Sequence, residues 1–263
     1  MSRLGFLFLQ WLKRDLEGRY RGSWLGLLWP LVQPIAQIAV FTLIFHGFMN
    51  VRWPSADGGA FGTGSAWDYA QNVLAGLAVF NFFSEVLGRA PSAILSNPNL
   101  VTKVRFPLLL LPIVTVASAT THIFAGLFVL LVSGFFSGTL ELSALGFVPW
   151  ILPVTLYGFG LAVLLASLGV YVRDIGQLMP AITSLLMFLT PIFYPLAAVP
   201  EALRGLFAIN PVAWGAESLR SMVLGGSSVV WSDWGVHLFA SAAFAMIGLA
   251  LFRGLAKGFA DVL

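Results

Sequence analysis

The chain has 263 residues, of which 59% are apolar and only 10% are charged, and its mean hydropathy is +0.90. Soluble domains carry about 25% charged residues, so this composition excludes a soluble domain and predicts an integral membrane protein folded as one compact bundle. Because the chain has no cysteine, disulfide bonds, thiolate metal sites and cysteine nucleophiles are excluded. The net charge of +3 gives no reason to expect a nucleic acid partner.

Residues 1–22 read as a short cytoplasmic helix rather than a membrane span. Apolar side chains recur on one helical face at Leu4, Leu7, Phe8, Trp11 and Leu12. An amphipathic helix with such a stripe and a basic end lies in the membrane interface. The basic residues that precede the first long apolar run are Lys13, Arg14, Arg19 and Arg21. The positive-inside rule therefore places the N-terminus in the cytoplasm, and a signal peptide is rejected because charges stand where its cleavage site should be.

Six apolar runs approach or exceed the length of about 20 residues that a helix needs to cross a bilayer. They cover residues 24–47, 69–88, 106–136, 148–172, 177–195 and 235–252. With six spans, the tail 253–263 returns to the cytoplasm, eleven of the 14 basic residues fall inside, and three fall outside. The sequence therefore predicts an all-α membrane protein, with one transmembrane domain over 1–263, its spans within 24–252 and both termini cytoplasmic.

Two segments do not read as simple spans. The first, 48–68, is rich in Gly, Ser and Asp and predicts an irregular external loop. The second, about 198–226, is apolar but interrupted by prolines and charges. We expect two short re-entrant helices there, on the periplasmic side before the last span, because irregular backbone at membrane depth survives only when it is packed against protein. The charges form the i,i+3 pairs Glu201–Arg204 and Glu217–Arg220.

The chain carries no motif for nucleotide binding or catalysis. It has no Gly-x-x-x-x-Gly-Lys-Ser/Thr, so it does not bind ATP through a P-loop. The histidines, His46, His122 and His237, fall in different spans without i,i+4 partners, which leaves a metal site unsupported. An enzyme is therefore disfavoured. A stand-alone ion-coupled transporter is disfavoured too, because no ionisable Asp, Glu, Lys or Arg lies in the middle of a span.

Few polar groups lie within the predicted spans. Glu85 and Arg89, at i,i+4 near the inner end of the second span, indicate a structural ion pair. Thr115, Ser118 and His122 share one face of the third span. They either line a polar path or make interhelical hydrogen bonds, and the sequence leaves both alternatives open.

Five segments spread over nearly the whole chain form a recognisable set. They are residues 14–30 (RDLEGRYRGSWLGLLWP) with Pro34, residues 96–107 (SNPNLVTKVRFP), Arg173-Asp174 after the fourth span, residues 191–195 (PIFYP), and Asn210-Pro211. In this order, and together with six spans, they resemble the permease subunits of ABC-2 type exporters, specifically those that export polysaccharides such as O-antigen.

The resemblance implies a channel-forming subunit with no catalytic residue, cofactor or metal of its own. Two copies would form a homodimer in the bacterial inner membrane, with two copies of a cytoplasmic ATPase that binds ATP and Mg²⁺. The substrate would be a polyprenyl-diphosphate-linked polysaccharide, moved from cytoplasm to periplasm. The alternative is an ABC-2 permease that exports a small drug or lipid.

The resemblance also places two groups of candidate residues. Residues expected to couple to the ATPase are Asp15, Glu17, Arg19, Asn97, Leu100, Val101, Lys103, Arg105, Arg173 and Asp174. Candidates for the channel or the periplasmic gate are Thr115, Ser118, His122, Asn210, Glu217 and Arg220. The loop 96–107 combines basic residues with apolar groups that a solvated loop does not need. This favours docking into a groove of the ATPase over a helix lying on the membrane surface.

Overall fold

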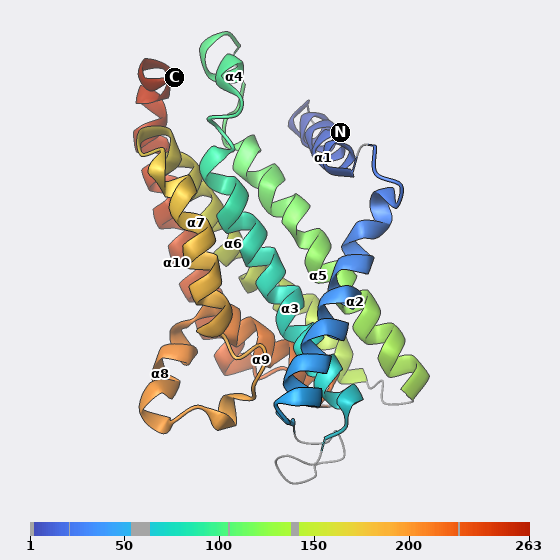
Figure 1. Ribbon diagram of the computed structural model, residues 1–263. Coiled ribbons are helices and arrows are strands. Elements are labelled where there is room, and N and C mark those ends of the chain that lie inside the picture. Colours follow the sequence, from blue (N-terminus) through green and yellow to red (C-terminus); the bar gives the residue numbers. More distant parts are fainter. Residues whose placement is uncertain (1–2, 21, 54–63, 105, 138–141, 226) are drawn as a thin grey trace.

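The computed structural model describes residues 3–20, 22–53, 64–104, 106–137, 142–225 and 227–263, and every regular element in these ranges is helical (Figure 1). The α-helices are α1 (Arg3–Tyr20), α2 (Trp29–Phe41, continued by a π-helical segment, Thr42–Phe48), α3 (Ala66–Arg89), α4 (Pro98–Thr102), α5 (Leu110–Ser137), α6 (Phe147–Tyr171), α7 (Asp174–Phe188), α8 (Glu201–Ile209), α9 (Pro211–Val223), α10 (Trp231–Leu255) and α11 (Phe259–Val262).

Five helical stretches are long and apolar enough to cross a membrane. They are Trp29–Phe48, Ala66–Ser92, Leu110–Phe136, Leu142–Tyr171 and Trp231–Val262. These stretches coincide with five of the six predicted spans, namely 24–47, 69–88, 106–136, 148–172 and 235–252. The all-helical fold and these five elements are therefore confirmed.

The sixth predicted span, 177–195, is not one continuous helix. Helix α7 has 15 residues and ends at Phe188, which corresponds to about 22 Å of helix, whereas a bilayer core is about 30 Å thick. The helix ends where it does because Pro191 has no N–H to donate and disfavours helical backbone in the residue before it. From Leu189 to Pro195 the chain follows an irregular path.

Helix α3 forms the centre of the bundle. It contacts α2, α5, α6, α7 and α9. In its most apolar 18-residue window 72% of the residues are buried, against 6% in the corresponding window of Trp29–Phe48. Small residues bring neighbouring helices close: a Cβ on Gly126 of α5 would lie 2.3 Å from the Cβ of Ala78 in α3. Because such close approach is how membrane helices gain packing energy, α3 is held tightly on several sides.

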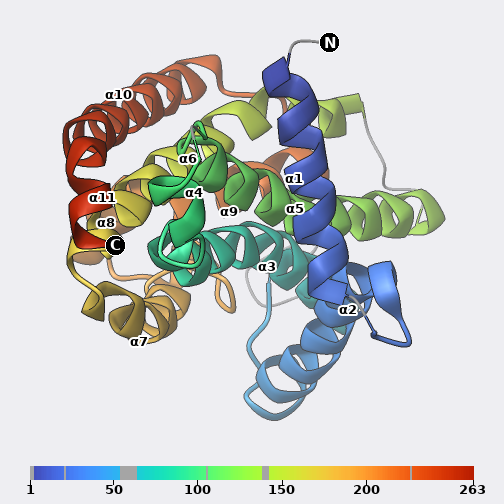
Figure 2. The same cartoon turned by 90° about the horizontal axis from the view of Figure 1, so that it is seen from above.

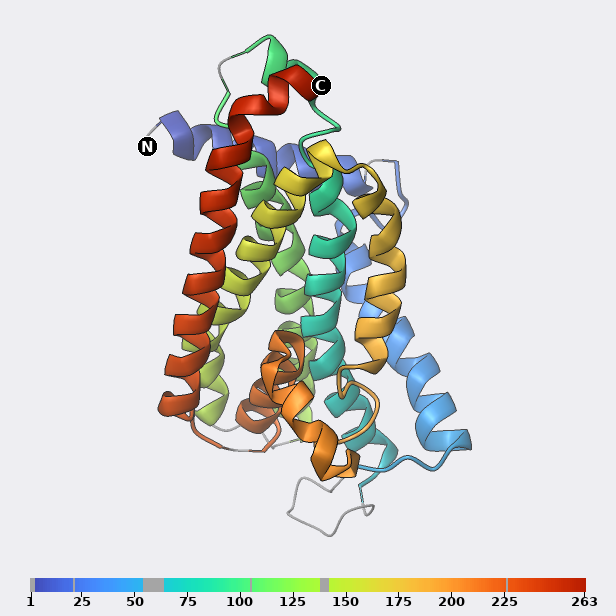
Figure 3. The same cartoon turned by 90° about the vertical axis from the view of Figure 1, so that its left-hand side faces the viewer.

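The two ends of the bundle carry different elements. Both termini, α1 and α4 lie at one end, while α8 and α9 lie at the other (Figures 1 and 3). Helix α1 runs across its end of the bundle rather than along it (Figure 2). The two short helices expected in 198–226 are present as α8 and α9, joined at Asn210.

Candidate functional site

At the end that carries both termini, Glu85 of α3 is the centre of a charged cluster. Its side chain is only 9% exposed and meets groups from three helices. Arg19 of α1 contacts both carboxylate oxygens, with Nη1 2.9 Å from Oε2. Arg89 Nη1 lies 2.8 Å from Oε1, and His122 Nε2 of α5 lies 2.6 Å from Oε2. The predicted Glu85–Arg89 pair is confirmed, and the structure adds partners from α1 and α5.

Asp15 of α1 connects the same cluster to α5. Its Oδ2 accepts a hydrogen bond from Ser118 Oγ at 2.5 Å, and its other oxygen contacts the Arg89 guanidinium. Arg19, one helical turn away, lies 3.6 Å from Asp15. Together, two carboxylates and two guanidiniums fix α1 across the ends of α3 and α5.

The polar face of α5 makes the interhelical hydrogen bonds that were one of the two alternatives from the sequence. Ser118 and His122 both make interhelical hydrogen bonds. Thr115 is buried and donates to Leu111 O of its own helix at 3.2 Å. Ser118 and His122 therefore join α5 to α1 and α3 within one copy of the chain, while His122 also lines a hollow.

Two hollows flank the charged cluster. One is lined by Trp11, Arg14, Asp15, Gly18, Arg19, Glu85, Arg89 and Asn97, and the other by Arg19, Ser23, Trp29, Gln33, Asn81, Ser84, Glu85 and His122. Beside the second hollow, Asn81 Nδ2 donates to Gln37 Oε1 at 3.1 Å. Polar groups thus continue from the cluster along the contact of α2 with α3.

The described coupling residues of the loop 96–107 lie on or directly next to the protruding helix α4. Leu100 and Val101 are half-buried and pack on an apolar cluster of this chain, while Lys103 is exposed. Asn97 precedes the helix and donates through Nδ2 to Ala93 O at 3.1 Å. The apolar residues therefore face this chain's own bundle. Arg105 lies outside the described residues.

The remaining coupling candidates divide into exposed and internal groups. Glu17 is exposed, and so are Arg173 and Asp174 at the start of α7. By contrast, the side chains of Asp15 and Arg19 are 22% and 20% exposed and belong to the internal charged cluster. Of the three coupling candidates on α1, only Glu17 is therefore exposed, and its carboxylate lies 3.7 Å from Lys13 Nζ.

At the opposite end of the bundle, the buried side chain of Arg220 in α9 makes more hydrogen bonds than that of any other channel or gate candidate. It is 4% exposed. It donates to Asn72 O at 2.9 Å, to Pro191 O at 2.7 Å and to Ile192 O at 3.1 Å. Its Nη1 also lies 2.6 Å from Glu217 Oε1, which confirms the predicted pair. Arg220 thus joins α9 to α3 and to the irregular segment after α7.

The surroundings of Arg220 are shaped to hold a guanidinium. The ring of Trp53 lies 4.7 Å from its central carbon, in cation–π geometry. A Cβ on Gly76 would lie 2.6 Å from its Nη2, so a glycine makes room for it. The guanidinium is protonated, because arginine is not deprotonated in proteins, and Glu217 supplies the opposite charge.

Side chains from several helices satisfy the backbone of the irregular segment. Asn210 Nδ2 donates to Leu189 O at 3.2 Å and to Thr190 Oγ1 at 3.1 Å, and Tyr69 Oη donates to Phe193 O at 3.1 Å. With the two carbonyls bonded by Arg220, the carbonyls of Leu189, Pro191, Ile192 and Phe193 all accept hydrogen bonds from side chains of this chain.

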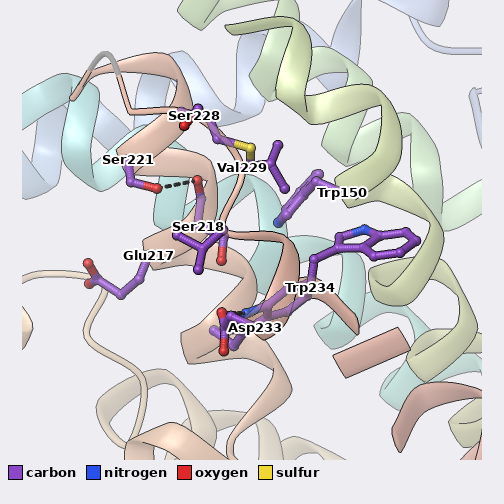
Figure 4. Close-up of a pocket in the computed structure, with 11 residues that line it drawn as sticks. Trp150, Glu217, Ser218, Ser221, Ser228, Val229, Asp233 and Trp234 are labelled. Atoms are coloured by element: carbon purple, nitrogen blue, oxygen red, sulfur yellow. Dashed lines mark hydrogen bonds between the residues drawn. The ribbon is translucent and has the colours of Figure 1, made fainter. Parts of the chain in front are cut away.

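A pocket lies between α9, α6 and α10 (Figure 4). Its lining residues are Trp150, Trp214, Glu217, Ser218, Ser221, Met222, Ser228, Val229, Val230, Asp233 and Trp234. Each indole N–H there is used within the chain: Trp150 donates to Gly215 O at 3.2 Å, Trp214 to Asp233 Oδ2 at 2.6 Å, and Trp234 to Pro149 O at 2.9 Å. The pocket walls therefore tie α9 to both neighbouring helices.

No pattern in the sequence indicates that Tyr69, Trp214 and Asp233 make hydrogen bonds at this end of the bundle. Tyr69 and Trp214 are aromatic residues within apolar segments, where packing is the usual role. Asp233 lies in the first turn of α10, where an acidic residue is common. For Asn210 the signal was available: an Asn-Pro pair is typical of a helix N-cap followed by proline at the first position. Asn210 Oδ1 indeed accepts a hydrogen bond from the Val212 amide at 3.0 Å.

Residues 7–224 match the model of the ABC-2 type transporter family. This covers well over half of the chain, so the chain belongs to the ABC-2 type transporter family. It is a multi-pass membrane permease, and members of this class are transmembrane subunits rather than catalysts.

Relatives with described roles agree with this assignment. The chain is 24% identical over 265 residues to the O-antigen export system permease protein RfbA of Klebsiella pneumoniae, covering 99% of this chain and 97% of the relative. It is 30% identical over 209 residues to RfbA of Myxococcus xanthus, covering 78% and 75%. It is 25% identical over 271 residues to the polysialic acid transport protein KpsM of Escherichia coli, covering 96% of each chain.

Proposed function

We propose that the chain is the transmembrane, channel-forming subunit of an ATP-driven exporter that moves a polyprenyl-diphosphate-linked, O-antigen-like polysaccharide from cytoplasm to periplasm. The observation that carries the proposal is that relatives matched over nearly the whole chain are named for O-antigen export or polysialic acid transport. Their names favour a polysaccharide over the small drug or lipid considered from the sequence.

Energy would come from two copies of a separate cytoplasmic ATPase that binds ATP and Mg²⁺, because the chain itself has no P-loop. The end with both termini supports this arrangement. It presents α4 beyond the bundle (Figure 1), together with the exposed charges of Glu17, Lys103, Arg173 and Asp174. The positive-inside rule puts this end in the cytoplasm of a bacterial inner-membrane protein.

Helix α3 offers a physical route from the ATPase side to the exit side. Its inner end holds Glu85 and Arg89, which bind α1, and its outer end supplies Asn72 O to Arg220 of α9. We infer that a displacement of α1 by the ATPase is passed through this central helix to α9. The coupling would rest on one rigid, buried element that both ends contact.

A homodimer would complete the channel. The rest of the chain covers little of α2 and α7. Only Pro34 of Trp29–Phe48 and Met179 of α7 are buried, and α7 exposes Leu178, Ile182, Leu185 and Phe188. Gln33 lines a hollow beside α2, so polar groups accompany this apolar face. We propose that α2 and α7 meet the second copy around the path of the substrate.

Deletion of the gene tests the proposed function. Finished lipid-linked polysaccharide should accumulate on the cytoplasmic side of the inner membrane, and a plasmid-borne copy should restore its appearance outside. As a matched control, inactivation of the partner ATPase should give the same accumulation. Normal surface polysaccharide in the deletion strain, with retention of a drug or lipid instead, would reject the proposal in favour of the alternative substrate class.

A further inference from the structure

The C-terminal residues 256–263 fold back over the inner end of the bundle. After α10 the chain turns through a short 3₁₀ segment, Ala256–Gly258, into α11. The Tyr171 hydroxyl donates to Leu255 O at 2.8 Å, which fixes the point where the chain turns. A Cβ on Gly258 would lie 2.6 Å from that hydroxyl, so a larger residue there would have to displace the Tyr171 side chain and disturb its bond to Leu255.

Phe259 anchors the returning tail. Its side chain is 0% exposed, and its ring centroid lies 5.6 Å from that of Phe252 and 6.0 Å from that of Tyr171. Helix α11 contacts both α6 and α4, and the end of the chain lies beside α4 (Figure 3). Leu263 packs against the same apolar cluster that receives Leu100 and Val101 of α4.

Helix α4 depends on such contacts for its position. It has 5 residues, and an isolated helix shorter than about 12 residues is not stable in water. After α4, the ring of Phe106 lies 5.3 Å from that of Trp11 in α1, which holds this side of the loop 96–107. On its other side, α4 contacts α11. Its outward face, with Asn99, Thr102 and Lys103, stays exposed.

We propose that residues 256–263 form a C-terminal brace that sets the position of α4, and that Phe259 and Leu263 are positioning residues for energy coupling. The inference rests on the proposed function, in which α4 docks on the ATPase. Contact of α4 with α11, and packing of Leu100 and Val101 on the apolar cluster that includes Phe259, hold the exposed face of α4 outward. Without the brace, α4 would open locally, so that ATP hydrolysis no longer moves the bundle.

The first test measures the brace itself and does not depend on export. Because the chain has no cysteine, a single Leu100→Cys reports on α4 by its rate of reaction with a maleimide in membranes. Adding Phe259→Ala should raise this rate by about tenfold or more, since removal of a buried aromatic side chain leaves its neighbours unsupported. Phe239→Ala, which removes an exposed phenylalanine of α10, is the matched control and should leave the rate unchanged. An unchanged rate with Phe259→Ala would overturn the proposal.

The second test measures coupling in the intact complex with its ATPase. With Phe259→Ala, polysaccharide exported per ATP hydrolysed should fall about tenfold, while the amount of permease in the membrane stays at the wild-type level. Phe259→Leu should recover most of the ratio because it keeps apolar volume. If Phe259→Ala raises the reaction rate of the cysteine at position 100 but leaves the export-to-ATP ratio unchanged, the brace has no role in coupling. If the wild-type chain binds no ATPase at all, the proposed function fails instead.

Discussion

Arg220 shows how one side chain can hold three segments together. Its donors reach three backbone carbonyls as well as Glu217, so its charge and its fork of N–H groups serve different partners. A lysine has fewer donors and no planar fork, and does not replace arginine at such a site. The requirement is therefore for the guanidinium, rather than for a positive charge near Glu217.

Exchange of the two charges separates these roles. The double variant Arg220→Glu with Glu217→Arg keeps an ion pair but leaves the carbonyls of Asn72, Pro191 and Ile192 without donors. Each unsatisfied buried group costs about 1–3 kcal/mol, so the double variant should export no better than Arg220→Glu alone and should unfold at a lower temperature than the wild type. Recovery of export in the double variant would mean that the ion pair alone matters.

A substitution of Glu85 gives a comparable test at the end of α3 that contacts α1. Removing one partner of a buried ion pair costs about 3–5 kcal/mol, and the Glu85 carboxylate bonds Arg19 of α1. Glu85→Gln should therefore loosen α1, and trypsin should cleave at Lys13 and Arg14 faster than in the wild type. Glu17→Gln is the control because the Glu17 side chain is 62% exposed. Equal cleavage of both variants would contradict an anchoring role for the cluster.

At the scale of the element, the prediction from the sequence differs from the structure at the end of α7. Hydropathy continues through 177–195 and predicts a complete span, but α7 ends at Phe188, three residues before Pro191. The groups that satisfy the irregular backbone, such as Tyr69 and Arg220, are more than 25 residues away in sequence. Periodicity detects the faces of one helix and carries no information about such distant partners, so the sequence predicted the helices well and this site poorly.

Asn210 joins two elements and gives a prediction at this scale. Its side chain caps α9 and also bonds Leu189 O and Thr190 Oγ1 beyond the end of α7. Loss of an N-cap costs about 1 kcal/mol, and the freed carbonyl adds to this. Asn210→Ala should lower the melting temperature of the purified protein, whereas Asn99→Ala, an exposed position on α4, should not. Equal melting temperatures for the two variants would remove the capping role.

At the scale of the whole molecule, the shortness of α7 makes its side of the membrane testable. If α7 and residues 189–195 together cross the membrane, a reporter after Gly205 in α8 should be periplasmic, as should one after Ser143. Reporters after Asn97, Gly176 and Leu263 should be cytoplasmic, because the basic residues favour that side. A cytoplasmic reporter after Gly205 would mean that α7 returns without crossing, and would leave the five long stretches as the only spans among the described residues.

The arrangement of two copies can be tested with the same cysteine-free chain. In a two-fold dimer, residues near the axis meet their own counterparts, and a disulfide forms only when the two Cα atoms come within about 7 Å. Cysteines at exposed positions of α2 (Ile35, Val40) should therefore cross-link between copies under oxidation, with yields that vary along the helix at its period of 3.6 residues. Cysteines at equally exposed positions of α10 (Val236, Phe239) should not. Cross-links through α10 and none through α2 would place the partner on the opposite face, and the channel could then not lie between α2 and α7.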